Sequence, residues 1–180
     1  MAYRDAKQEI VQGYRRNENG WQIIANHEIY GVTPSMVDWW WDNTDTTERY
    51  KLWHPTDHIS FQWLVAPAHY GHVGAVQRIE EFLNGIPATP TTLEIRWEDP
   101  KDADAEYSHV LLGTVTGNPK GTLMHEYEAA PFGLRMRSHF QLAAETPEEI
   151  VAALYEHNKQ EMVRFSLFLP DLYHSSISAK

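Results

Sequence analysis

The sequence predicts an α+β fold of the helix-grip (START/Bet v 1-like) class, in which a curved antiparallel sheet wraps a long C-terminal helix. Two observations predict it. Apolar and polar residues alternate with a period of two through most of residues 59–143, in segments separated by Gly, Pro, Asn and Asp. Residues 146–169 instead combine helix-start signals with one apolar stripe. This order of elements leaves a cavity between sheet and helix, and such cavities bind small molecules.

The 180 residues suffice for one domain with a single core. Residues 1–32 are predicted to form an N-terminal arm with at most one helical turn in residues 1–20, followed by a short extended segment over residues 21–30. Residues 33–175 are predicted to form the domain itself.

Two short helices are expected at the start of this domain. Thr33 and Pro34 suit the N-cap and first helical positions, so a helix should run to about Asn43. A helical turn over residues 46–50 should follow, with His54 at its exit.

The sheet is expected next, with hairpin spacings that predict antiparallel pairing. Pro87, Pro90, Pro100, Pro119 and Pro131 are expected between strands. The predicted strands are residues 59–65, 73–83, 91–97, 106–116, 123–130 and 134–143.

The C-terminal helix has the clearest signals. Thr146 suits the N-cap, Pro147 the first helical position, and Glu149 completes a capping box. The helix should continue to about Leu169 and end before Pro170.

Composition restricts the chemistry. With no cysteine, a thiolate nucleophile, a disulfide or a sulfur-rich metal site is excluded, so any metal must be held by His, Asp or Glu. The net charge of −10 disfavours nucleic acid and anionic lipid as partners. Because we find no basic and apolar leader and no apolar run of bilayer length, we expect a cytoplasmic protein with no membrane contact.

One aromatic-rich stretch, Trp39–Trp63, holds five of the seven tryptophans and should line an interior surface. His54 lies within it, between Trp53 and Pro55. Such a histidine is either a hydrogen-bonded core residue or a metal ligand.

Two ionisable residues, His157 and Glu161, interrupt the apolar stripe of the C-terminal helix. Residues four apart lie one above the other on a helix, so this pair could offer two ligands to one ion. The alternative is a simple His–Glu hydrogen bond. Apolar neighbours on the same stripe, Leu154 and Phe165, favour the ligand interpretation.

Strand parity selects further inward residues. Glu81 shares a face with Ile79 and Leu83, whereas Glu80 should point outward. In the same way His125 should point inward beside Tyr127, and His139 of the next strand outward.

A buried carboxylate or imidazole is costly unless it is paired or bound to a metal. We therefore expect His54, Glu81, His157 and Glu161 to share one divalent cation. The pair His54 and His58 is also four apart, but Pro55 argues against a continuous helix through both, so the two are not expected to act together as ligands.

At these positions the sequence resembles the 2,4-diacetylphloroglucinol hydrolase family, which includes phloretin hydrolase. The similarity extends in order from about residue 33 to 170. It is carried by Arg49-Tyr50-Lys51-Leu52-Trp53-His54-Pro55, Gly74-Ala75-Val76 before Glu81-Phe82, Met124-His125-Glu126, Arg135-Met136-Arg137-Ser138, and His157 with Glu161.

The resemblance implies a helix-grip fold with Zn²⁺ held by His54, Glu81, His157 and Glu161. It places His125 over the substrate as the catalytic residue. Candidate substrate-binding residues are Tyr50, which with Thr46 is one of two candidates for a family Tyr, Asp57, where the family has Asn, and the inward Tyr127. Phe140 replaces a family Tyr, so the same chemistry on a different ring is expected.

The leading hypothesis is thus a zinc-dependent hydrolase that cleaves a C–C bond between an acyl group and a polyphenol, such as an acylphloroglucinol, or a β-diketone. Its partner is a small aromatic or polyketide-like substrate, and the resemblance is compatible with a homodimer. The alternative is a non-catalytic carrier or a cyclase-like polyketide-binding protein of the same fold.

Overall fold

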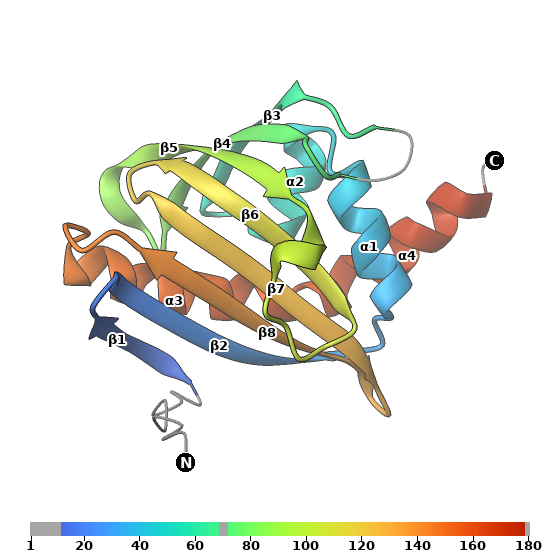
Figure 1. Ribbon diagram of the computed structural model, residues 1–180. Coiled ribbons are helices and arrows are strands. Elements are labelled where there is room, and N and C mark those ends of the chain that lie inside the picture. The colour runs from blue at the N-terminus through green and yellow to red at the C-terminus, as the bar shows by residue number, and fades with distance from the viewer. Residues whose placement is uncertain (1–11, 69–71, 179–180) are drawn as a thin grey trace, which may run out of the picture.

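The computed structural model describes residues 12–68 and 72–178, in which a large antiparallel sheet is packed against helices (Figure 1). The eight strands are ordered β1-β2-β8-β7-β6-β5-β4-β3, with every neighbouring pair antiparallel. This confirms the predicted α+β class and the antiparallel sheet. The strands are β1 (Gly13–Asn17), β2 (Gly20–Tyr30), β3 (His58–Val65), β4 (Val76–Leu83), β5 (Ile86–Glu98), β6 (His109–Gly117), β7 (Gly121–Ala130) and β8 (Gly133–Leu142).

Two short helices connect β2 to β3, as expected. Thr33 caps the first helix by accepting the N–H of Met36, and Thr46 caps the second helix, whose C-cap is His54. The second helix is longer than the predicted turn. The helices are α1 (Pro34–Asn43), α2 (Thr47–Trp53), α3 (Glu148–Val163) and α4 (Phe165–Ser178), and a 3₁₀ turn η1 covers Pro100–Asp102.

The C-terminal helix differs from the prediction at both ends. The N-cap is Pro147 rather than Thr146, and it makes no side-chain capping bond. Arg164 separates α3 from α4, because its N–H bonds back to Glu161 in a tighter turn. Pro170 lies inside α4 instead of ending it.

The N-terminal part also differs from the predicted arm. Residues 13–17 form β1 rather than a helical turn, and β2 pairs along its length with β8. Residues 1–11 lie outside the described residues. Pro87 and Pro90, expected between strands, belong to β5. They are tolerated there because the β5–β6 pairing begins only at Leu93, so neither position needs an N–H toward β6.

Helix α3 runs along the inner face of the sheet, behind the strands in Figure 1, and α1 and α2 close the end near β3. Trp40, Trp53 and Phe165 pack edge to face or stacked between these helices. The fold thereby encloses a mostly apolar cavity between sheet and helices. Among the described residues, no helix combines the length and apolarity required to span a bilayer.

Candidate metal centre

Four ionisable side chains converge at one end of the cavity. His58 opens β3 and pairs directly with Glu81 on β4, while His157 and Glu161 come from one turn of α3. The His58 Nε2 atom lies 3.7 Å from Glu81 Oε2 and 3.4 Å from Glu161 Oε2, and His157 Nε2 lies 3.7 Å from Glu161 Oε2. All four side chains are buried.

The other ring nitrogen of each histidine is held by an acceptor. His58 Nδ1 lies 2.9 Å from the carbonyl oxygen of Tyr50, and His157 Nδ1 lies 3.0 Å from Oδ2 of Asp57. Because a carbonyl or carboxylate oxygen can only accept, both Nδ1 atoms donate. This orients a lone pair on each Nε2 toward the carboxylates when the ring is neutral, as in histidine ligands of metal sites. Neither Nε2 has a hydrogen-bond partner within the described part of the chain.

The two carboxylates are also oriented from outside the cluster. Glu161 Oε1 accepts a 2.9 Å hydrogen bond from the side-chain amide of Asn158, which leaves Oε2 for the cluster. Glu81 Oε2 accepts a hydrogen bond from the Tyr50 hydroxyl. The Tyr50 ring stacks on His58 with 3.8 Å between ring centroids.

The charges of the cluster stabilise one another. Burial alone would raise the pKa of Glu161, but His58, His157 and His125 lower it to about 2. Burial alone would lower the pKa of His157, but Asp57, Glu161 and Glu81 raise it to about 9. Without an ion, therefore, the positive charge of protonated His157 offsets part of the negative charge of the carboxylates around it. A divalent cation bound by the same atoms would take over that role, and the donor set of two imidazoles and two carboxylates fits one.

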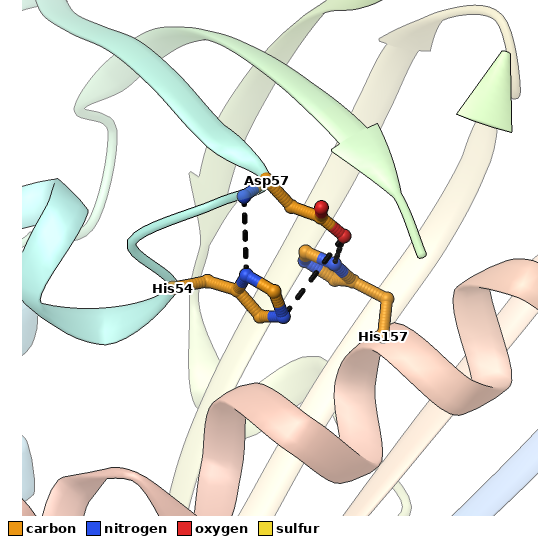
Figure 2. Close-up of side chains that lie close together, drawn as sticks. All are labelled: His54, Asp57 and His157. Atoms are coloured by element: carbon orange, nitrogen blue, oxygen red, sulfur yellow. Dashed lines mark hydrogen bonds and ion pairs between the residues drawn. The ribbon is translucent and has the colours of Figure 1, made fainter. Parts of the chain in front are cut away.

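His54 lies beside Asp57 and His157 (Figure 2) but makes different contacts from those of His58. Its Nδ1 accepts the N–H of Asp57 at 3.2 Å, and its Nε2 lies 3.2 Å from Oε1 of Gln160. His54, Asp57 and His157 also form a group close enough to hold a metal. However, the Asp57 oxygen in that group already accepts the Nδ1–H of His157. His58, His157 and Glu161 form a second group close enough to hold a metal, so His58 is a candidate ligand that the sequence analysis did not include, beside the predicted ligand His54.

As expected from Pro55, no continuous helix runs through His54 and His58, because α2 ends at Trp53, but the two histidines still lie close together. The N–H of His58 bonds to the carbonyl of His54 at 3.0 Å, so a single helix-like turn brings both rings to the same region. Proline is tolerated in such a turn because its missing N–H falls at the first position. Strand alternation from Phe61 would place His58 on the outer face, but a bulge between His58 and Ser60 turns it inward opposite Glu81, and no sequence signal marked that bulge.

The remaining predicted site residues divide into two groups. His125 and Tyr50 line the cavity together with Glu81, His157 and Glu161. Asp57, predicted to bind substrate, accepts the Nδ1–H of His157. Tyr127 is buried, but its hydroxyl donates to Asp38 at 2.6 Å. Phe140 lines the cavity, in keeping with the predicted change from the family Tyr.

The inward and outward assignments of the strand residues are confirmed. Glu81 is buried, while Glu80 accepts from Ser60 on the opposite face. His125 is buried against the parallel ring of Trp41, and His139 contacts Glu126 on the outer face. The aromatic stretch lines the cavity only in part, through Trp40, Trp41, Tyr50, Trp53 and Phe61.

A family model for the DAPG hydrolase PhiG domain matches residues 2–146 of this chain. The chain therefore belongs to the DAPG hydrolase family. This confirms the resemblance seen in the sequence and supports a hydrolytic enzyme. The matched region includes His58, Glu81 and His125, and α3 with its His157 and Glu161 follows it. A search of curated proteins gave no match.

Solved structures share the fold of this DAPG hydrolase family member at low identity. A Rhodobacter sphaeroides protein has a TM-score of 0.58 at 12% identity, covering 88% of this chain and 97% of its own. A Mycobacterium smegmatis protein has a TM-score of 0.56 at 10% identity, covering 89% and 98%. A Chromobacterium violaceum protein has a TM-score of 0.55 at 12% identity, covering 82% and 96%. At these identities the similarity concerns the fold alone.

Proposed function

We propose that this protein is a zinc-dependent hydrolase of helix-grip fold that cleaves the C–C bond between an acyl group and a polyphenol or β-diketone. The proposed ligands are His58, Glu81, His157 and Glu161. The observation that carries the proposal is the pair of buried Nε2 atoms, each backed by an acceptor on Nδ1 and facing two carboxylates at the end of an apolar cavity.

The site supports the reaction as follows. When bound, Zn²⁺ would polarise the acyl carbonyl and make water a better nucleophile at neutral pH. The hydroxyl of water joins the acyl carbon, the C–C bond breaks, and the ring carbon takes up the other proton of water. An electron-rich phenol tolerates this leaving group because its oxygen shares the developing negative charge.

The rest of the cavity positions a flat substrate. Trp41, Trp53 and Phe61 offer aromatic faces and edges on which a small aromatic or polyketide-like molecule can pack. His125 lies on the same cavity wall, so it can meet a substrate oxygen on which charge develops.

Metal content and product analysis together test the proposal. We expect about one zinc per chain by elemental analysis, and release of a carboxylic acid and the deacylated ring from acylphloroglucinols or β-diketones. Removal of zinc with a chelator should abolish turnover, and added Zn²⁺ should restore it. A purified protein that contains no metal, binds such ligands and releases no acid would instead be the non-catalytic carrier or cyclase-like protein of the alternative hypothesis.

A further inference from the structure

Three buried polar residues, His27, Ser138 and Asn158, connect His125 to Glu161 in one hydrogen-bonded chain. Ser138 and Asn158 have no exposed surface, and His27 is 5% exposed. His125 Nδ1 lies 2.9 Å from Ser138 Oγ, which lies 3.2 Å from His27 Nε2. His27 Nε2 lies 3.1 Å from Asn158 Oδ1, and the Asn158 amide donates to Glu161 Oε1 at 2.9 Å.

The direction of each bond follows from its end at Glu161. A carboxylate oxygen only accepts, whether or not its partner oxygen binds a metal, so the Asn158 nitrogen faces Glu161 and its oxygen faces His27. Because an amide oxygen also only accepts, His27 Nε2 must carry the hydrogen. His27 Nε2 then has no lone pair with which to accept from Ser138.

The Ser138 hydroxyl must therefore donate elsewhere. Within residues 12–68 and 72–178, its side-chain hydrogen bonds are those to His27 and His125. If His125 Nδ1 donated to Ser138, a fully buried hydroxyl proton would be left without an acceptor, which is costly. Ser138 thus donates to Nδ1 of His125, while its oxygen accepts from His27.

We infer that His27, Ser138 and Asn158 are positioning residues that hold His125 as a neutral imidazole with its hydrogen on Nε2, the ring nitrogen left for the cavity. Burial lowers the pKa of His125 to about 3 and that of His27 to about 4, so both rings are neutral at pH 7. The ring plane is fixed as well, since Trp41 stacks on it at an interplanar angle of 10°.

This arrangement defines what His125 can do in the proposed reaction. A protonated Nε2 cannot accept a proton, so His125 acts on the substrate as a hydrogen-bond donor to an oxygen rather than as a base. The same chain holds the Glu161 carboxylate through Asn158, so one network orients both the donor and a proposed metal ligand. The role in catalysis rests on the proposed function, whereas the tautomer does not.

The tautomer can be measured without substrate. Long-range ¹H–¹⁵N correlation spectra of protein labelled at the histidine rings distinguish Nδ1–H from Nε2–H imidazoles. We expect Nε2–H signals for both His27 and His125, each assigned by its disappearance in the corresponding His→Gln variant. A neutral His125 protonated at Nδ1 would overturn the inference.

Substitutions of Ser138 test its role. Ser138→Ala should increase the Nδ1–H form of His125 and lower kcat roughly three- to tenfold, the effect of one neutral hydrogen bond, with little change in KM. Ser138→Thr, which keeps the hydroxyl, should restore both. Ser60→Ala, which removes a hydroxyl from the outer face of the sheet, should change neither. Unchanged tautomer and kcat in Ser138→Ala would contradict the inference.

The two proposals fail separately. Spectra recorded before and after addition of Zn²⁺ show whether His125 keeps its hydrogen on Nε2 in both the metal-free and the zinc-bound protein. If the tautomers are as expected but the protein neither binds zinc nor hydrolyses acylated phenols, the inferred hydrogen-bond network is supported and the proposed function is wrong. If hydrolysis is found and His125 carries its hydrogen on Nδ1, the inferred hydrogen-bond network is wrong and the proposed function is supported.

Discussion

His58 Nε2, at the start of β3, lies 3.4 Å from Glu161 Oε2 on α3. The two residues are far apart in the sequence. Each side chain is oriented by a hydrogen bond on its other polar atom: His58 Nδ1 donates to the Tyr50 carbonyl, and Glu161 Oε1 accepts from the Asn158 amide. Because both side chains are already oriented by these partners, the two groups need little rearrangement to bind a cation.

The first prediction separates His58 from His54. His58→Ala should remove zinc, because it deletes a proposed ligand and leaves two buried carboxylates with less compensation. His54→Ala should keep about one zinc per chain, since its Nδ1 and Nε2 contact Asp57 and Gln160. Elemental analysis of both variants decides between them. Loss of zinc in His54→Ala with retention in His58→Ala would restore the assignment made from sequence.

The second prediction uses neighbouring glutamates on β4. Glu81→Gln should abolish zinc binding, because the cavity-facing carboxylate loses its charge. Glu80→Gln should not, since Glu80 contacts Ser60 on the other face. The two variants have the same composition, which makes them matched controls. Equal zinc content in the two proteins would exclude Glu81 as a ligand.

The third prediction concerns Asp57, which accepts the Nδ1–H of His157. Asp57→Asn should weaken zinc affinity roughly 10- to 100-fold while the fold is retained, as expected for a residue that orients a metal ligand. If Asp57 bound substrate instead, as first predicted, KM would rise and zinc affinity would stay the same. Competition with a chelator of known affinity, together with steady-state kinetics, distinguishes the two outcomes.

Parts of this site follow from the sequence for clear reasons. Parity along a strand identified Glu81 and His125 as inward, because side chains alternate strictly on a pleated strand. Helical periodicity identified His157 and Glu161, which share a buried stripe. Both arguments depend only on local geometry, and local geometry is regular within strands and helices.

Other parts could not be predicted because they depend on turns and on contacts distant in sequence. The turn from His54 to His58 decides which imidazole faces Glu161, and no periodicity describes it. Pro170 lies within α4, although a proline in a helix interior removes one backbone hydrogen bond and is expected to end the helix. The role of Ser138 depends on three residues from separate elements, its partners His27 and His125 and the Asn158 that bonds to His27.

The fourth prediction concerns acid stability of the metal-free protein. Burial lowers the pKa values of His27 and His125 below the ordinary 6.5 to about 4 and about 3, so the unfolded chain binds protons that the folded chain does not. Their contribution to stability is therefore fully present above about pH 6.5 and is lost as the pH falls toward their folded pKa values.

This linkage can be measured by urea unfolding in the presence of a chelator. Near pH 5, each of these histidines should add about 1.4 kcal/mol per pH unit to the slope of unfolding free energy against pH. His125→Gln should reduce the slope by about that amount, whatever its effect on stability at pH 7. A slope identical in the two proteins would show that His125 is not held neutral.

The last prediction concerns how His125 contributes to turnover. His125→Ala should keep its zinc, because His125 lies outside the proposed ligand set, and should lose roughly 10²–10³-fold in kcat, the usual cost of removing a donor to a developing oxyanion. His125→Gln should recover part of this loss, because the amide nitrogen of Gln can take the place of Nε2–H.

A residue that transferred a proton would behave differently, since Gln can neither gain nor lose one at neutral pH, and both variants would then be equally impaired. If His125 were only a core residue beside Trp41, melting temperature and turnover would fall together. Comparing zinc content, melting temperature and kcat in the two variants therefore separates a hydrogen-bond donor, a proton-transfer residue and a packing residue.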